Sequence, residues 1–486
     1  MIGVVSFGSY IPWFRLSREL LRRVWGWLSA LPMSGEKAVA NYDEDAITMA
    51  VEAGMECILC SGVNREAIDG VYFASTSPTF KERSCAEIVA TALDLRPDIY
   101  IADFTNTTKA GTTALLSAYN AVKAGSAQNI LVCASECRSR IAKCGSSYEA
   151  LFGDAAASVL IGRGDVVAEI KAFHSISYDF PDFWRTYRDD YERAWEDRFI
   201  REEAYLKFIP EAISAVLKKA ELRPEDISRV CYPALFPREY MTIATNLGFK
   251  ADQLQPSMLD TIGDTGSAWP IIMLIAALEE ARPGDRILMA SYGNGSDTIL
   301  FEVTDGVERI RGKAKSVKSQ IESKRYLDNY GKYLVFCEAI HVERGRRAED
   351  TSLTPLTEQW RRRRAILAFV GTKCKKCGLP QFPPQKVCAN PDCNAWDAME
   401  PYRFSEKKGT LFSFTEDYLA FCYVPPAIYG IVDFDGGGRW IMDITDVEPG
   451  MCKVGMRVRP TFRRKVVDHE RGIIIYSWKV TPRLAD

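Results

Sequence analysis

Four cysteines near residue 380 form two closely spaced pairs. Two residues separate Cys374 from Cys377, and four separate Cys388 from Cys393. Four thiolates at this spacing can surround one Zn²⁺ ion as a tetrahedron with Zn–S bonds of about 2.3 Å. Because all four ligands are cysteines, no position is left for water, and the sequence predicts a structural site. The metal would then supply folding energy to a segment with little apolar core. An iron–sulfur cluster and a metal-free ribbon are the alternatives.

Short alternating strands follow these cysteines. We expect strands at 409–419, 427–435, 439–447, 457–467 and 472–482. Turn signals separate them, including the glycines at 436–438 and the EPG sequence at 448–450. Five short strands with glycine turns are typical of a small Greek-key barrel. We therefore predict a zinc ribbon at 366–402 and an OB-fold barrel at 403–486.

The first 310 residues alternate between helical and strand-like patterns. The runs ILVCASE (130–136) and ILMASYG (287–293) are typical of buried strands. An amphipathic helix is expected before each of them, at 112–125 and at 270–284. This alternation predicts an α/β fold whose sheets are covered by helices.

An internal duplication is indicated in the same region. The stretches 107–136 and 264–293 can be laid over each other without gaps, and their apolar positions largely coincide. We therefore expect one domain at 1–310, built from two similar halves at about 1–165 and 166–310. A terminal helix at 321–340 and a charged linker would fill residues 311–365.

Charge and hydropathy exclude some classes of protein. The formal net charge is −2, which argues against a general nucleic-acid binder. No stretch reaches the roughly 18 to 20 apolar residues that a membrane span needs. The first residues, MIGVVSFGSYIP, have no basic leader or cleavage site and predict a strand. We expect a soluble cytoplasmic protein with neither nucleic acid nor membrane as a partner.

Two resemblances extend this interpretation. The cysteine segment and the strand KKGTLFSFT (407–415) resemble the zinc-ribbon/OB proteins that accompany thiolases and hydroxymethylglutaryl-CoA (HMG-CoA) synthases. The first 330 or so residues resemble archaeal-type HMG-CoA synthases, through TTKAGTTA (107–114), LFGDAAASVLIG (151–162), IGDTGSA (262–268) and ARPGDRILMASYGNGSD (281–297). The resemblance implies a thiolase fold, in which two similar halves form five layers with the active site between them. It also implies a coenzyme A (CoA) thioester as ligand.

The residues that carry this family's chemistry are missing here. The family condenses acyl groups on a cysteine, helped by a histidine, an asparagine and a glutamate. Transferred onto this chain, the cysteine falls on Thr108, the glutamate on Thr76, the histidine near Pro233 and the asparagine on Asp264. A threonine hydroxyl without a neighbouring base is a poor nucleophile at neutral pH. We therefore predict that the chain forms no acyl-enzyme. It has three histidines, none at the base position: His174, His341 and His469.

Candidate CoA contacts lie in two places. Asn294 and Gly295 belong to the glycine-rich SYGNGSD loop, and Arg361 and Arg362 belong to a run of four arginines. The arginine run suggests either a solvated helix or a phosphate-binding rim for CoA.

Two functions remain open. The first is an acyl-CoA-binding subunit that lacks the nucleophile and acts as a scaffold for a thiolase-type catalytic partner, or as half of a homodimer. The alternative is an enzyme with changed chemistry, such as retro-aldol cleavage of a CoA thioester. Asp264 would then be the base, Tyr240 an acid, and Thr108 with the glycine-rich loop would hold the thioester oxygen.

Overall fold

The computed structural model describes residues 1–26, 34–340, 342, 354–420, 422, 424–468 and 470–485. They group into two compact units. The first comprises Met1–Asn41, Asp45–Val89 and Arg96–Ile340. The second comprises Tyr42–Glu44, Ala90–Leu95 and His341–Asp486. The first unit thus runs to Ile340 and includes 321–340, for which the sequence predicted a terminal helix. Within the described ranges, no helix combines the length and apolarity that crossing a bilayer requires.

Nine strands of the first unit are joined in the order β11-β12-β13-β8-β1-β7-β6-β4-β5. One group consists of β1 (Ile2–Tyr10), β4 (Gly70–Ala74), β5 (Tyr100–Phe104), β6 (Asn129–Cys137) and β7 (Asp154–Arg163). The other consists of β8 (Ala168–Ser177), β11 (Arg229–Cys231), β12 (Arg286–Ala290) and β13 (Gly295–Val303). The two groups meet where Gly3 and Val4 pair with Glu169 and Ala168. A Cβ on Gly3 would lie 2.0 Å from the carbonyl oxygen of Ala168, so this approach requires glycine.

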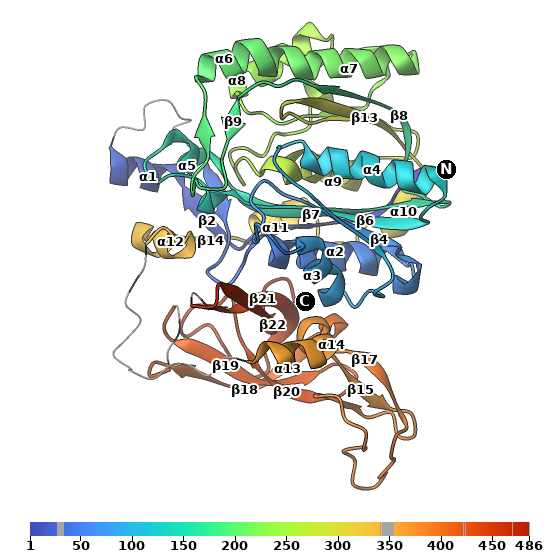
Figure 1. Cartoon of the computed structure of the whole chain (residues 1–486), viewed down its shortest axis with the longest axis vertical. Coiled ribbons are helices and arrows are strands. Elements are labelled where there is room, and N and C mark those ends of the chain that lie inside the picture. The colour runs from blue at the N-terminus through green and yellow to red at the C-terminus, as the bar shows by residue number, and fades with distance from the viewer. Residues whose placement is uncertain are drawn as a thin grey trace. The chain divides into compact units, whose positions relative to one another are not determined.

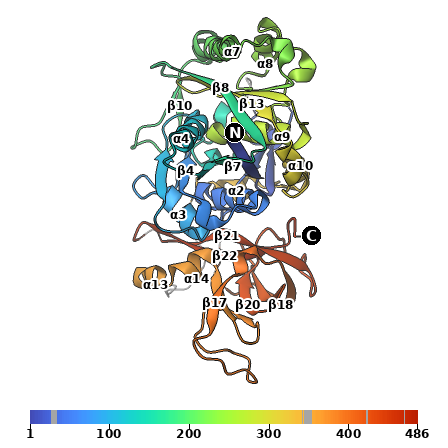
Figure 2. The same ribbon diagram turned by 90° about the vertical axis from the view of Figure 1, so that its right-hand side faces the viewer.

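Helices complete a five-layer arrangement (Figure 1). Helices α4 (Ala110–Ala124) and α9 (Trp269–Glu280) lie between the two groups of strands. Helices α7 (Leu206–Ala220) and α8 (Pro237–Asn246) cover one outer face, and α2 (Ala46–Ser61) covers the other. The view in Figure 2 shows the same layers. The predicted thiolase-type fold is confirmed. The two stretches that overlay in the sequence each supply one middle-layer helix and one strand after it.

Two sequence predictions for this unit are wrong. The helix expected at 270–284 is not amphipathic, because the first ten residues of α9, between the two groups of strands, are all buried. The single helix expected at 321–340 is instead α11 (Val317–Glu322), the short strand β14 (Arg325–Tyr326) and α12 (Tyr330–Phe336). Strand β14 pairs with β2 (Phe14–Ser17), and the Asn329 side chain caps the start of α12. That pairing and that cap favour a break over a continuous helix.

The segment between β8 and α7 contributes residues to the candidate site. It forms a short hairpin of β9 (Phe183–Trp184) and β10 (Arg193–Ala194), followed by α6 (Asp197–Phe199) and one π-helical turn (Ile200–Tyr205). The remaining elements of the unit are α1 (Arg18–Trp25), β3 (Glu36–Val39), α3 (Cys85–Ala92), α5 (Ser147–Leu151) and α10 (Gly306–Ile310).

The second unit contains two small antiparallel sheets. The first has the order β16-β15-β17, from β15 (Val370–Cys374), β16 (Pro380–Gln381) and β17 (Met399–Arg403). The other has the order β20-β19-β18-β21-β22, from β18 (Gly409–Asp417), β19 (Ala427–Phe434), β20 (Arg439–Asp443), β21 (Arg457–Asp468) and β22 (Ile473–Thr481). A bridge from Ile444 to Val480 links its edges. Helices α13 (Leu356–Arg361) and α14 (Arg363–Ala368) precede both. The OB-type prediction is confirmed.

Candidate functional site

A small pocket of the first unit opens between its two groups of strands. Its walls consist of Thr108, Arg138, Phe183, Pro233, Leu235, Asp264, Gly266, Trp269 and Tyr292. Three of the four positions singled out in the sequence, Thr108, Pro233 and Asp264, therefore converge on one site. No histidine or cysteine is among these wall residues. His174 lies in β8, paired with Thr298, whereas His341 and His469 lie outside the described residues.

Thr108 precedes α4, and its hydroxyl is already engaged. Its Oγ1 donates to the main-chain carbonyl of Tyr292 at 2.6 Å, and Thr107 donates to the carbonyl of Gly293 at 3.0 Å. A Cβ on Gly293 would lie 2.4 Å from the Thr108 hydroxyl oxygen, so only glycine allows this approach. Two adjacent threonines thus hold the loop that follows β12.

Asp264 forms a buried ion pair. Its Oδ2 lies 2.6 Å from Nη1 of Arg138, and its Oδ1 accepts the main-chain N–H of Gly266 at 2.8 Å. Nη2 of Arg138 lies 2.6 Å from the carboxylate of Glu192, which comes from the hairpin excursion. Burial raises the pKa of Glu192, against the opposing effect of Arg138. The Arg138 guanidinium also covers the ring of Phe152, 3.7 Å from its centroid.

Thr76 is not a wall residue, but Glu136 connects it to the turn that carries Asp264. Its N–H and hydroxyl donate to the carboxylate of Glu136 at 2.9 and 3.0 Å. Glu136 is fully buried and also accepts the N–H and hydroxyl of Ser267, at 3.1 and 2.7 Å. Ser77 adds two further donors to Glu136. Glu136 therefore ties the Thr76 loop to the turn that carries Asp264.

Pro233 and Tyr240 differ in their relation to the cavity. Pro233 is a wall residue, and its carbonyl accepts the Tyr205 hydroxyl at 2.7 Å. Tyr240 is not among the wall residues, and its hydroxyl donates to the carbonyl of Gln255 at 2.5 Å. Burial raises the pKa of Tyr240. Its hydroxyl is thus occupied by a main-chain bond, which is unfavourable for the acid role considered above.

The candidate CoA residues do not line this cavity. Asn294 adopts a left-handed conformation, with φ 49°, and its side-chain amide donates to the carbonyl of Phe180 at 2.8 Å. A Cβ on Gly295 would lie 2.1 Å from the carbonyl oxygen of Ile176. Both residues therefore shape the loop. In the second unit, Arg361 is exposed at the end of α13, and Arg362 pairs with Glu358 at 2.7 Å.

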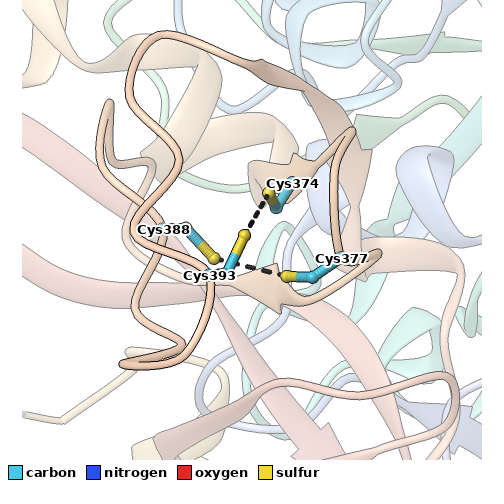
Figure 3. A group of neighbouring side chains, drawn as sticks. All are labelled: Cys374, Cys377, Cys388 and Cys393. Atoms are coloured by element: carbon cyan, nitrogen blue, oxygen red, sulfur yellow. Dashed lines mark hydrogen bonds between the residues drawn. The ribbon is translucent and has the colours of Figure 1, made fainter.

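The four cysteines of the second unit are gathered at one point (Figure 3). Their sulfur atoms all lie within 4.8 Å of one another. Cys374 and Cys393 are 3.8 Å apart, and Cys377 and Cys388 are 3.4 Å apart. A tetrahedron with 2.3 Å bonds needs sulfur atoms about 3.8 Å apart, so the spacing fits Zn²⁺. Gly378, with φ 78°, turns the chain so that its N–H reaches the carbonyl of Cys374 at 2.8 Å.

Curated relatives match the first two thirds of the chain. A hydroxymethylglutaryl-CoA synthase of Methanopyrus kandleri is 34% identical over 342 residues, which are 68% of this chain and 96% of that protein. The hydroxymethylglutaryl-CoA synthase of Archaeoglobus fulgidus is 34% identical over 341 residues, which are 69% of this chain and 98% of that protein. This chain belongs to the hydroxymethylglutaryl-CoA synthase family. It extends beyond these relatives through the zinc ribbon and the OB-type domain.

Family models and solved structures agree with that assignment. The family model of 3-oxoacyl-[acyl-carrier-protein] synthase III matches residues 102–178. The model of the C-terminal part of that synthase matches residues 217–299. The rubredoxin-like zinc ribbon of ChsH2 matches 363–396, and the C-terminal OB-fold domain of ChsH2 matches 402–463. A crystal structure of HMG-CoA synthase complexed with CoA gives a TM-score of 0.61 at 18% identity, covering 73% of this chain and 95% of that one. A crystal structure of 3-oxoacyl-[acyl-carrier-protein] synthase III from Aquifex aeolicus gives a TM-score of 0.57 at 23% identity. It covers 62% of this chain and 100% of that one. The HMG-CoA synthase fold and the metal site of a zinc ribbon are therefore both present.

Proposed function

We propose that the HMG-CoA synthase module binds a CoA thioester without forming an acyl-enzyme. The chain would act as the acyl-CoA-binding subunit of a complex that forms or cleaves C–C bonds. Membership of the family supports the ligand. The cavity between the two groups of strands, with its mixed apolar and polar walls, supports the place where the acyl group would lie.

The bond from Thr108 to Tyr292 carries the proposal. The hydroxyl hydrogen of Thr108 already points to a carbonyl oxygen, and the nearest wall residues offer no histidine to remove it. A serine or threonine becomes a nucleophile only when an adjacent base accepts its proton. Asp264 is held by Arg138 and Gly266, and Pro233 has no basic group. Acyl transfer through this chain is therefore disfavoured.

The proposed partner is a subunit that supplies the catalytic cysteine, which this chain would lack. A subunit that binds the thioester but does not acylate needs a catalytic chain that supplies the cysteine. A thiolase-type subunit in a hetero-oligomer fits this requirement, and a homodimer is the alternative. The zinc ribbon would be a structural metal site in this assembly, because its four cysteines leave no position for a reacting water.

The test combines binding with covalent labelling. Calorimetry with acetyl-CoA should give saturable binding, and intact-mass spectrometry after incubation should show no added acetyl group. An acetylated native chain would refute the missing-nucleophile assignment. Failure to bind any CoA thioester, alone or with a co-purified thiolase-type chain, would refute the binding role.

One observation favours a second candidate, retro-aldol cleavage. Asp264 places a carboxylate on the cavity wall, 2.6 Å from Nη1 of Arg138. As the base, Asp264 would take the proton of a 3-hydroxyl group. The bond between carbons 2 and 3 would break, releasing a carbonyl product and leaving an enolate that is then protonated. Turnover of a 3-hydroxyacyl-CoA by the isolated chain, abolished by Asp264→Asn with binding retained, would select this candidate.

A further inference from the structure

A second cavity lies at the end of α9 that is far from the candidate site. Its volume is about 120 Å³, which is close to that of an engineered apolar cavity of roughly 150 Å³ that binds benzene. Glu279 on its wall comes ten residues after Trp269 on the wall of the candidate site, about 15 Å along the helix. The second cavity is therefore a separate place for a small ligand. Its wall consists of Phe7, Leu278, Glu279, Val307, Ile310, Arg311, Gly312, Ala314 and Ser316.

Much of this wall is carbon, and one side of it is open. Four wall residues from β1, α9 and α10 are at most 4% exposed, namely Phe7, Leu278, Val307 and Ile310. Gly312 is exposed, and a Cβ built on it would meet no atom within 4 Å. A ligand could therefore enter beside Gly312 and place an apolar body against the four buried side chains.

The Glu279 carboxylate on this wall receives few hydrogen bonds. Its two oxygens share one donor, the main-chain N–H of Val317, at 3.0 and 3.2 Å. Among the described residues it has no second donor. An ionised carboxylate has about four positions that can accept a hydrogen bond. This half-buried carboxylate can therefore accept further hydrogen bonds from a ligand.

The wall also carries a cation, Arg311, but its charge is already paired. Its Nε and Nη2 donate to the carboxylate of Glu308 at 2.9 and 3.0 Å. Its Nη1 and Nη2 also donate to the main-chain carbonyls of Glu279 and Ala281, at 3.1 and 2.6 Å. Glu280, the next residue of α9, adds negative charge near the Glu279 carboxylate. The cavity therefore presents a carboxylate whose charge Arg311 does not balance.

We infer that this cavity binds a small organic ammonium ion. The ammonium group would donate to the Glu279 carboxylate, and a body of about four to six carbon atoms would lie against the apolar wall. A metal ion such as Ca²⁺ or Mg²⁺ fits poorly, because it needs about six oxygen ligands and the wall offers one carboxylate. The inference does not depend on thioester binding, since the two walls share no residue.

Occupancy should depend on the protonation of Glu279. Burial raises the pKa of Glu279 to about 7, against the opposing effect of the Val317 N–H and with a smaller contribution from Glu280. An ammonium ion binds the ionised carboxylate, whose fraction falls about tenfold from pH 8 to pH 6. Binding should therefore weaken about tenfold over the same range.

A ligand-observed NMR titration of the full chain with butylammonium chloride tests this. At pH 8 we expect saturable binding that is about tenfold or more tighter than that of 1-butanol, which lacks the charge. Sodium butyrate, which has the opposite charge, should not bind saturably. Glu279→Gln should weaken butylammonium binding about tenfold or more and remove its dependence on pH. Glu87→Gln is the matched control, because Glu87 is exposed on α3 of the same unit.

Three results would overturn the inference. They are no saturable binding of butylammonium at pH 8, equal affinity for butylammonium and 1-butanol, and butylammonium binding that Glu279→Gln leaves unchanged. None of them bears on thioester binding. Should Glu279→Gln fail to fold, Ala314→Leu takes its place, because it narrows the same cavity with an apolar side chain. Unchanged butylammonium binding in Ala314→Leu would overturn the inference as well.

Discussion

Nη1 of Arg138 lies 2.6 Å from Oδ2 of Asp264, and both residues are buried on the cavity wall. The positive charge therefore comes from the loop after β6, and the negative charge from the turn before α9. The ion pair joins the two groups of strands at the candidate site. Removing Arg138 would leave two buried carboxylates, those of Asp264 and Glu192, without their cation.

Arg138→Met should lower the free energy of unfolding by about 3 kcal/mol, because Asp264 and Glu192 would remain as buried carboxylates without a cation. The double variant Arg138→Met/Asp264→Asn should recover at least about 1 kcal/mol of that loss. Chemical denaturation measures both. Arg193→Met, which removes an exposed pair with Asp189, is the control and should cost less than about 1 kcal/mol. Equal effects of Arg138→Met and Arg193→Met would contradict the prediction.

Thr108→Cys should not restore condensation. The thiol would still lack a base, because Pro233 occupies the expected histidine position, and groups that act as a unit recover little when one is added back. The readouts are intact-mass spectrometry with acetyl-CoA and an assay for a condensed thioester. Thr108→Val should cost roughly 1 kcal/mol of stability through the lost bond to Tyr292. Condensation by Thr108→Cys alone would disprove the account of the missing machinery.

The purified protein should contain about one zinc per chain. Cys388→Ser should lose the metal and make residues 366–402 sensitive to protease, because the metal supplies the folding energy of the ribbon. Elemental analysis and limited proteolysis measure the two effects. Cys452→Ser is a suitable control, since Cys452 is buried but is not part of the four-cysteine cluster. Zinc retained in Cys388→Ser would show that the ligand set is wrong.

Glu279, at the end of α9, should make stability depend on pH. Burial raises its pKa from 4.5 to about 7, and the N–H of Val317 donates to its carboxylate at 3.0 Å. Between pH 4.5 and 7 the folded state holds a proton that the unfolded state releases, so this contribution to stability falls as pH rises and is flat above pH 7. Glu279→Gln should therefore be more stable than the parent by roughly 1 to 2 kcal/mol at pH 8.

Thermal unfolding of Glu279→Gln and the parent at pH 5 and pH 8 measures this difference. The advantage of the variant should shrink at pH 5, where most of the parent's Glu279 is protonated. Glu87→Gln is the control, because Glu87 is exposed on α3 of the same unit. A gain for Glu279→Gln that is the same at both pH values would contradict the assigned cause.

Local patterns in the sequence predicted the architecture well, but they did not predict which residues of the site contact one another. The spacing of the cysteines predicted the four-cysteine cluster because the two members of each pair are close in sequence. The amphipathic interpretation of 270–284 was wrong because the spacing of apolar residues does not reveal that strands cover both faces of the helix. The break at Ser323 depends on the pairing of β14 with β2, some 300 residues away.

The residues of the site that sequence reasoning missed have partners that lie far away in the sequence. Arg138, which was missed, lies 126 positions from Asp264, which was singled out, and Glu192 comes from a third segment, so no local motif connects the three. Glu136 ends the strand-like run ILVCASE, and Tyr292 lies in the glycine-rich loop that the sequence did single out. A charged residue at the end of an apolar strand was the one local signal for Glu136. The partners of each could be found only in the folded chain.

The contact of Thr107 and Thr108 with Gly293 bears on how this chain could evolve. A thiol donates a weaker hydrogen bond than a hydroxyl, so a cysteine at position 108 would weaken the link to the carbonyl of Tyr292. A larger residue at 293 could not compensate, since any side chain there collides with the threonines. Placing a cysteine at position 108 would therefore also loosen the loop after β12, a segment more than 180 positions away in the sequence.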